Sequence, residues 1–301
     1  MNKLLIICGA TCTGKTSLAI DCALKLNTDV VSADSQLIYR NLNIGTAKPT
    51  VAEMRGVKHH MIDIVSPDKN FSVSDYVRLS EAVIDKIDSE NKIPVVCGGT
   101  GFYIKSLIYD LSYGHTPADE GIRQKYAEIL NEKGKEYLYN LLKKCDNETA
   151  AKLHINDTKR VIRALEIYEI SGKRKSDIHD GFKLKRAFSA FAIDYPREQL
   201  YGMIDKRVDL MFDKGLVDEV ENLLRDGINE NNQCMQAIGY KEVLFCLKNG
   251  DNQNTMRDII KQNTRHYAKR QITFFKKLDG IIWLKPEEAN CETVLELYGA
   301  I

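Results

Sequence analysis

The chain has 301 residues, of which 44% are hydrophobic and 28% are charged. Such a chain can bury a sizeable core, either as one large α/β domain with an insertion or as two domains. The formal net charge of +1 does not by itself indicate a polyanionic partner. The eight cysteines form no C-x2-C pair, and no apolar run approaches the length of a membrane span, about 18 residues. We therefore expect a cytoplasmic protein with reduced thiols and no membrane association.

A glycine-rich stretch near the start of the chain has the pattern of a phosphate-binding loop. It matches G-x4-G-K-[ST] and lies between an apolar run at residues 4–8 and an amphipathic run at residues 17–26. The two glycines let the backbone bend around an anion, the lysine adds a positive charge, and the final hydroxyl is placed to bind Mg²⁺. The stretch therefore predicts a phosphorylated ligand with Mg²⁺ as cofactor. Its residues are Gly9, Ala10, Thr11, Cys12, Thr13, Gly14, Lys15 and Thr16.

Further short apolar runs predict buried parallel strands, and amphipathic patterns such as residues 74–90 separate the early ones. Strands that alternate with helices predict an α/β fold, a P-loop NTPase-like doubly wound parallel sheet with ligands at the carboxyl ends of its strands. The predicted strands after the first are residues 29–33, 61–65, 93–97, 188–193 and 281–284.

The strand pattern is absent between residues 114 and 185, where residues 123–142 and 157–171 have helical patterns. We therefore expect a helical insertion domain at 114–185 within a catalytic core of 1–113 and 186–301. Two basic blocks, 173–186 and 257–277, hold six and seven Lys or Arg residues. They indicate a surface for nucleic-acid phosphates, although a solvated helix face is the commoner explanation of any one such block.

Two polar motifs follow predicted strands, at the edge where a ligand should lie. Asp34 comes after residues 29–33, and its carboxylate can act as a general base, bind magnesium through water or cap a helix. Thr100 lies among three glycines after residues 93–97 and supplies a hydroxyl, although a helix-capping turn is the alternative. A kinase is disfavoured because the acidic Walker B residue is absent there, but Asp63, which ends another apolar run, keeps that alternative open.

Basic residues also gather on predicted helices. Arg160 and Arg163 are three residues apart and so share a face, which suits phosphates or a stacked base. Residues 264–271 mix cations with aromatic side chains, as a nucleic-acid surface would. Helix packing and solvated charge remain the alternatives for these stretches and for Arg207.

Taken together, these stretches resemble the bacterial tRNA dimethylallyltransferases, also called tRNA isopentenyl transferases. The matching segments occur in order over almost the full length of the chain. They are residues 9–16, 34–35, 44–49, 59–63, 98–103, 156–166, 207–220, 236–242 and 264–273.

The resemblance implies an enzyme that moves a dimethylallyl group from dimethylallyl diphosphate to N6 of adenosine 37, beside the anticodon of a tRNA, and releases diphosphate. It implies that Asp34 is the general base, that Thr100 steadies the bridging oxygen and that Arg207 neutralises the leaving group. Nothing in the sequence requires more than a monomer. The residues expected to contact the anticodon stem-loop are Ser35, Gln36, Leu37, Arg123, Lys159, Arg160, Arg163, Gln236, Gly239, Tyr240, Lys241, Arg265 and Lys269.

One segment departs from the family pattern. The family usually reads D-S-x-Q-x-Y, whereas Gln36 lies one position early here and Leu37 occupies the usual glutamine position. If that glutamine reads the adenine edge, recognition must be rearranged in this chain. The alternatives are an adenylate isopentenyltransferase, which would need neither the basic blocks nor the insertion, a P-loop kinase of a small metabolite, and a nucleic-acid-binding protein without catalysis.

Overall fold

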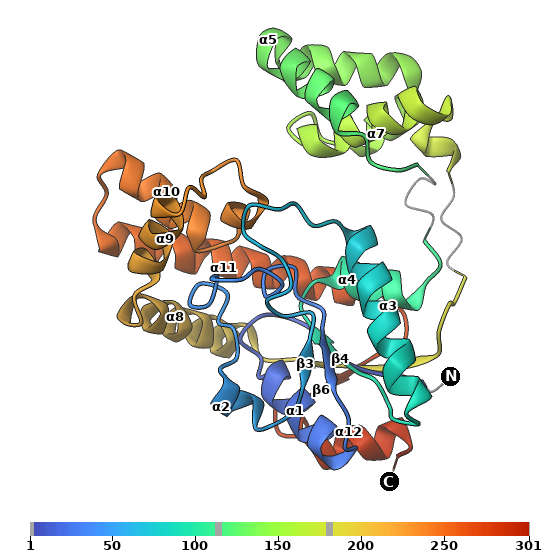
Figure 1. Ribbon diagram of the computed structural model, residues 1–301, viewed down its shortest axis with the longest axis vertical. Coiled ribbons are helices and arrows are strands. Elements are labelled where there is room, and N and C mark those ends of the chain that lie inside the picture. Colours follow the sequence, from blue (N-terminus) through green and yellow to red (C-terminus); the bar gives the residue numbers. More distant parts are fainter. Residues whose placement is uncertain (1–2, 112–115, 179–182, 301) are drawn as a thin grey trace. The chain divides into compact units, whose positions relative to one another are not determined.

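The computed structural model describes residues 3–111, 116–178 and 183–300 (Figure 1). The chain forms two compact units, which we call the core unit (Met1–Ile108 with Leu184–Ile301) and the insertion unit (Tyr109–Lys183). The boundary expected between residues 113 and 114 lies outside the described residues. The core unit therefore contains both ends of the chain.

The core unit is built on a six-stranded sheet of order β3-β2-β4-β1-β5-β6, in which all neighbouring strands are parallel. Leu5 and Leu4 face opposite sides of the central strand β1 and are equally buried, so both faces of the sheet are covered. The predicted doubly wound α/β fold is thus confirmed. The strands are β1 (Leu4–Cys8), β2 (Val30–Ser32), β3 (His59–His60), β4 (Val95–Gly98), β5 (Phe188–Ile193) and β6 (Ile281–Leu284).

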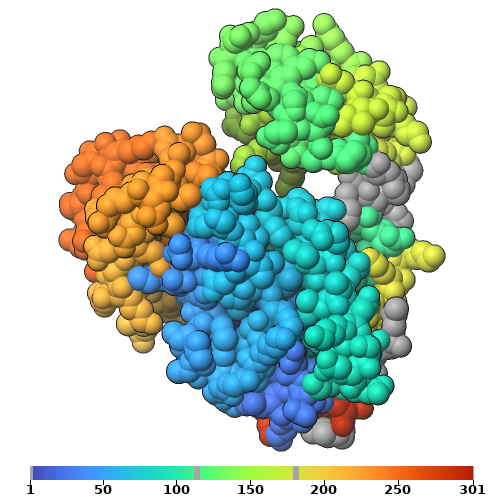
Figure 2. Space-filling view, viewed as in Figure 1, coloured from blue at the N-terminus to red at the C-terminus, as the bar shows by residue number. Residues whose placement is uncertain are grey.

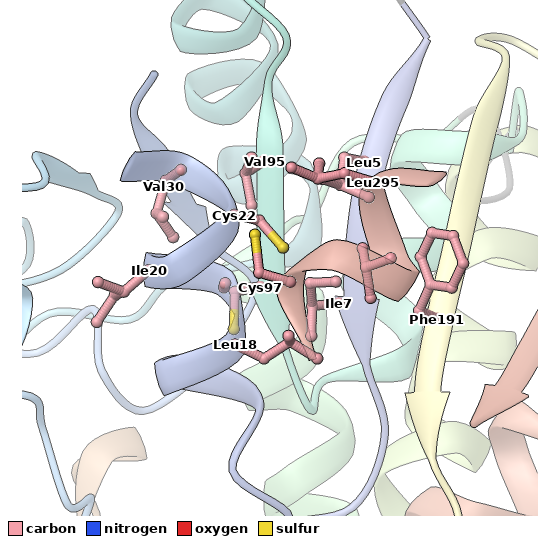
Figure 3. Packing of buried hydrophobic residues seen from close by; sticks show 14 of the residues in the cluster. Leu5, Ile7, Leu18, Ile20, Cys22, Val30, Val95, Cys97, Phe191 and Leu295 are labelled. Carbon is pink, nitrogen blue, oxygen red and sulfur yellow. The ribbon is translucent and has the colours of Figure 1, made fainter. Parts of the chain in front are cut away.

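Helices α1 (Lys15–Lys25) and α12 (Cys291–Tyr298) cover one face of the sheet. Leu18 of α1, Ile7 of β1 and Leu295 of α12 belong to one buried apolar cluster (Figure 3). Helices α3 (Val73–Ser89) and α4 (Gly101–Ile108) pack against each other, and α3 also contacts β2. Burial of these apolar faces holds α1, and with it the loop at its start, firmly against the sheet.

The helices after β5 place the C-terminal half of the core unit beside its N-terminal loops. Figure 2 shows the orange C-terminal helices and the blue N-terminal segments side by side, and the backbone of Ile44 is hydrogen-bonded to Glu219. These helices are α8 (Arg197–Asp213), α9 (Leu216–Arg225), α10 (Tyr240–Asn249) and α11 (Gln253–Phe275), and the short α2 (Val51–Met54) lies between β2 and β3.

The predicted strand at residues 61–65 is wrong. Met61 and Asp63 have left-handed backbone angles, with φ of 63° and 57°, which an extended strand cannot contain. The strand is instead the preceding pair His59–His60, which pairs with Val30 and Val31 of β2. The apolar run is explained by burial of Met61 and of Val65, which makes an isolated parallel bridge with Tyr39.

The insertion unit is helical and has a small core of its own. Helix α5 (Glu120–Cys145) is broken at Gly134, while α7 (Thr158–Ser171) ends at Gly172, whose φ is 68°. Leu138 and Leu165 are among the buried residues that join these helices to each other and to α6 (Asn147–Lys152). No helix in the described part of the chain is both long and apolar enough to cross a bilayer.

Candidate active site

The predicted phosphate loop connects β1 to α1 at the carboxyl edge of the sheet. Gly9 and Gly14 have φ of 121° and 79°, a region that side chains with a Cβ rarely adopt, and Cys12 has φ of 67°. The Thr13 hydroxyl donates to the Ala10 carbonyl at 3.0 Å and closes the loop on itself. The first turn of α1 follows at once, so its free N–H groups and positive dipole end point toward the loop.

Lys15 is a buried cation within this loop. Its ammonium group donates to the Ala10 carbonyl, and burial lowers the pKa of Lys15 below its ordinary value. The neighbouring Arg207 guanidinium lowers that pKa further. A buried cation beside a half-buried one favours an anionic ligand, because its negative charge offsets both the desolvation of Lys15 and the mutual repulsion of the two cations.

Arg207 comes from α8, on the far side of the insertion in sequence, yet it lies on the phosphate loop. Its guanidinium donates to the Thr11 hydroxyl at 3.2 Å and to the Thr46 carbonyl at 3.2 Å. The arginine therefore connects the phosphate loop to the loop around Thr46. A solvated charge, the alternative that the sequence left open, does not describe this contact.

The loop around Thr46 is held by a carboxylate that sequence reasoning missed. Glu219 of α9 accepts hydrogen bonds from the backbone N–H groups of Asn43, Ile44 and Gly45, at 2.9 to 3.2 Å. The buried Tyr240 hydroxyl donates to the same carboxylate at 2.5 Å. Tyr240, expected to contact tRNA, thus lies in the support of this loop. Glu219 lies within the family-like stretch 207–220, but its partners are far away in sequence.

Asp34 and Thr100 are brought together where β2 and β4 end. Asp34 Oδ1 accepts the backbone N–H of Gln36 at 2.8 Å, and no hydrogen-bond partner of Oδ2 occurs within residues 3–111, 116–178 and 183–300. Thr100 Oγ1 accepts the backbone N–H of Ser35 at 3.0 Å. Gly98 is required at this point because a Cβ there would overlap the Ala33 backbone. The turn therefore presents a carboxylate oxygen at the cavity.

Lys15, Arg207 and Asp34 line one cavity of about 340 Å³ in the core unit, whereas Thr100, a predicted catalytic residue, is not among the lining residues. The phosphate loop and the Asp34 turn supply polar groups to its wall. Helices α8 and α11 supply apolar side chains, and Lys241 and Arg270 add further cations. The lining includes Thr11, Lys15, Thr16, Asp34, Ser35, Gln36, Leu37, Ile204, Arg207, Val208, Met211, Gln236, Ile238, Lys241, Ile260, Tyr267, Arg270 and Gln271.

The remaining candidates of the core unit have different environments. Gly239 is buried, and its N–H donates to Glu242 at 2.7 Å. Arg265 is ion-paired with Asp205 at 3.1 Å, while Lys269 is exposed on α11. Gln236 and Lys241 are exposed at the cavity, which suits contact with a large substrate.

The basic candidates of the insertion unit form two groups. Lys159 and Arg160 are exposed at the start of α7. Arg123 and Arg163, by contrast, both bind the fully buried Glu166, with N–O distances of 2.9 and 2.6 Å. Hydrogen bonds from these arginines oppose the effect of burial and leave the pKa of Glu166 below its ordinary value. This ion-paired group joins α5 to α7, so Arg123 and Arg163 have a structural role inside the unit.

Comparison with known proteins identifies the family. A sequence model described as IPP transferase matches residues 37–278, which is more than half of the chain. A protein from Acetivibrio thermocellus named tRNA dimethylallyltransferase is 44% identical over 296 residues, covering 97% of this chain and 94% of that protein. The chain belongs to the IPP transferase family. A second IPP transferase relative, the tRNA dimethylallyltransferase of Alkaliphilus oremlandii, is 40% identical over 98% of this chain and 95% of its own length.

Solved structures of IPP transferases agree with this membership. The full-length tRNA isopentenylpyrophosphate transferase from Bacillus halodurans is 36% identical and has a TM-score of 0.73, covering all of this chain and 97% of its own. A eukaryotic dimethylallyltransferase described as acting on tRNA has a TM-score of 0.82 at 29% identity, covering 99% of this chain and 78% of its own. The predicted membership is confirmed.

Proposed function

We propose that this protein is a tRNA-modifying prenyltransferase that moves a dimethylallyl group from dimethylallyl diphosphate to N6 of an adenosine beside the anticodon. The observation that carries the proposal is one cavity in which the phosphate loop, Arg207, the Asp34 carboxylate and an apolar wall meet. The names of the IPP transferase relatives support tRNA as the acceptor.

The cavity fits both halves of an allylic diphosphate. Lys15, Arg207 and the start of α1 offer positive charge for the diphosphate. Ile204, Val208 and Met211 lie along α8 on the same wall and offer apolar contact for a five-carbon group. These aliphatic side chains lie beside the phosphate-binding groups and match a five-carbon group in size and polarity, so the lining favours the prenyl donor over ATP.

The chemistry uses the charges at both ends of the reaction. When the allylic C–O bond breaks, its electron pair leaves with the diphosphate, and Lys15 and Arg207 stabilise the new negative charge. The adenine N6 lone pair forms the new C–N bond, and the nitrogen then becomes acidic. Asp34 takes the proton released from N6, since its Oδ1 is fixed by the turn and its Oδ2 is available.

Magnesium fits this site through oxygen ligands. Thr16 and Asp34 line the same cavity, and Mg²⁺ prefers oxygen donors supplied by a few side chains and by substrate phosphates. Thr16 would hold the ion against the diphosphate, where it supplies further charge neutralisation. Among the described residues no group of three His, Cys, Asp or Glu side chains could hold a metal ion.

The tRNA surface is proposed on exposed cations in each unit. In the core unit, Lys241 and Arg270 border the cavity, and Lys269 is exposed on the same helix as Arg270. In the insertion unit, Lys159 and Arg160 are exposed together on α7. Such cations bind the phosphate backbone, and the target adenine must leave its stack to reach the donor.

The proposal is tested by offering three substrate pairs to the same protein. Dimethylallyl diphosphate with tRNA should yield prenylated adenosine in the tRNA. Dimethylallyl diphosphate with adenosine monophosphate should yield little product, and ATP should not be consumed in the presence of small acceptors. Rapid prenylation of the free nucleotide would favour an adenylate isopentenyltransferase, and ATP turnover without prenyl transfer would favour a kinase.

A further inference from the structure

A buried side-chain amide lies between the two loops that form the diphosphate end of the cavity. Gln271, on α11, is only 6% exposed. Its Oε1 accepts the backbone N–H of Thr11 at 2.9 Å, and its Nε2 donates to the backbone carbonyl of Gly99 at 2.9 Å. One side chain thus links the phosphate loop, the glycine loop that carries Thr100, and α11.

The bond to Thr11 determines which groups of the phosphate loop face the ligand. The Thr11 N–H is directed to Gln271 and is therefore unavailable to a bound diphosphate. The Thr11 hydroxyl in turn accepts the guanidinium of Arg207 at 3.2 Å. Gln271 and Arg207 hold the same residue, Thr11, from its backbone and its side chain.

The bond to Gly99 explains why this position is a glycine. A Cβ at Gly99 would overlap Nε2 of Gln271, so any side chain there would displace the amide. Gly99 precedes Thr100, whose hydroxyl accepts the N–H of Ser35 in the turn that presents Asp34. The Gln271 amide therefore links the phosphate loop to the glycine loop that supports the Asp34 turn.

We propose that Gln271 is a positioning residue that aligns Arg207 and the phosphate loop with the Thr100–Asp34 turn. This role rests on the proposed function, in which Arg207 and the phosphate loop hold the departing diphosphate and Asp34 receives the proton. Both bonds of the amide are needed, because an acceptor must face Thr11 and a donor must face Gly99. A misalignment of about 1 Å at such a site costs roughly 10²-fold in rate.

A second glutamine offers a matched control outside the cavity. Gln233 accepts the N–H of Phe71 at 2.8 Å and donates to the Phe71 carbonyl at 3.0 Å, so it makes the same two kinds of bond. We expect Gln271→Ala to lower the single-turnover rate of tRNA prenylation roughly 10²-fold, with tRNA binding unchanged. It should also weaken binding of inorganic pyrophosphate about tenfold. Gln233→Ala should leave the rate and both affinities unchanged.

Gln271→Glu separates positioning from simple loss of packing. A neutral carboxyl group can reproduce both bonds, donating to Gly99 and accepting from Thr11, whereas the carboxylate cannot donate. The rate of this variant relative to wild type should therefore rise as the pH falls. The charged and titratable groups that line the cavity with Gln271 are Lys15, Asp34, Cys97, Arg207, Lys241, Tyr267 and Arg270, and they are the same in the wild-type reference at each pH.

The outcomes distinguish this inference from the proposed function. If wild type prenylates tRNA but Gln271→Ala loses no more activity than Gln233→Ala, the positioning role is wrong. A ratio of Gln271→Glu to wild type that is constant with pH would also contradict it. If wild type makes no prenylated tRNA while Gln271→Ala still weakens pyrophosphate binding, the proposed function fails, and only the part of the role in which Gln271 holds the phosphate loop for an anion stands.

Discussion

Asp34 is the residue on which the proposed chemistry most depends. Its Oδ1 is occupied by the N–H groups of Gln36 and Leu37, so the carboxylate has a fixed orientation. An asparagine at this position keeps a carbonyl oxygen for these two bonds and removes only the basic oxygen. The substitution therefore tests basicity with little change in geometry.

We expect Asp34→Asn to lower the single-turnover prenylation rate by about 10²–10⁴-fold, because proton transfer from N6 loses its acceptor. Binding of tRNA and of pyrophosphate should stay near wild type, as measured by filter binding and calorimetry. Asp29→Asn removes a carboxylate that accepts from His60 outside the cavity, and should leave the rate unchanged. A rate for Asp34→Asn close to wild type would mean that another group takes the proton.

At the scale of single elements, sequence patterns predicted the loops and strands whose structure depends on residues close together in the chain. The phosphate loop was predicted from its motif, and the strands β5 and β6 were predicted with their observed bounds. β5 is buried along almost its whole length, and burial on both faces produces such continuous apolar runs. The strand β3 was misplaced, since only two residues pair and the adjacent apolar run ends in an isolated bridge of Val65 with Tyr39. A two-residue strand leaves too short a pattern to recognise.

Contacts between elements were not predictable from such patterns. Arg123 was expected to contact tRNA from the family resemblance, and Arg163 because it shares a helical face with Arg160. In the structure both bind Glu166, Arg123 from α5 and Arg163 from one turn earlier on α7. Helical spacing can indicate the pair Arg163–Glu166, three residues apart. The sequence offers no sign that Arg123 pairs with Glu166 or Thr11 with Gln271, since these partners lie 43 and 260 residues apart. The Gln271 amide was missed for the same reason.

The Glu166 ion-paired group predicts acid sensitivity of the insertion unit. Its folded pKa lies below the unfolded value of 4.5, so the carboxylate contributes stability above pH 4.5 that is lost as the pH falls through the folded pKa. We expect Glu166→Gln to destabilise α7 by about 1–3 kcal/mol at neutral pH and to flatten this pH dependence. Amide hydrogen exchange in the full chain measures both.

Glu169→Gln is the matched control on the same helix. Glu169 pairs with the exposed Lys125, and an exposed pair contributes about 0–1 kcal/mol. The control should exchange nearly as slowly as wild type. Equal effects of the two substitutions would show that the buried group does not hold α7 in place.

Two exposed cations of the insertion unit should differ in their effect on tRNA affinity, because Arg160 belongs to the proposed tRNA surface and Lys125 does not. Arg160 is 74% exposed and pairs only with a neighbouring residue, Asp157 at 3.3 Å, among the contacts of the described residues. Arg160→Ala should weaken tRNA binding and reduce the salt slope of log K by about one. Lys125→Ala, the same charge change on α5 of the same unit, should alter neither. Identical salt slopes for wild type and Arg160→Ala would place the tRNA surface elsewhere.

At the scale of the whole molecule, the site depends on segments of the core unit from both sides of the insertion unit in sequence. The phosphate loop and Asp34 lie before the insertion unit, whereas Arg207, Glu219 and Gln271 lie after it. The two halves of the core unit share one parallel sheet through the pairing of β1 with β5. Segments far apart in sequence therefore reach one cavity. The fold class could be predicted from the sequence, whereas these contacts could not.

The central claim is that the phosphate loop binds an allylic diphosphate beside Asp34 and an extruded adenine. A crystal structure of the protein with tRNA and a non-reactive thiolo analogue of dimethylallyl diphosphate tests it most directly. The account predicts the diphosphate against Lys15 and Arg207, with an Asp34 carboxylate oxygen about 3 Å from the adenine N6. A diphosphate bound away from this loop, or an Asp34 turned away from the adenine, would contradict it.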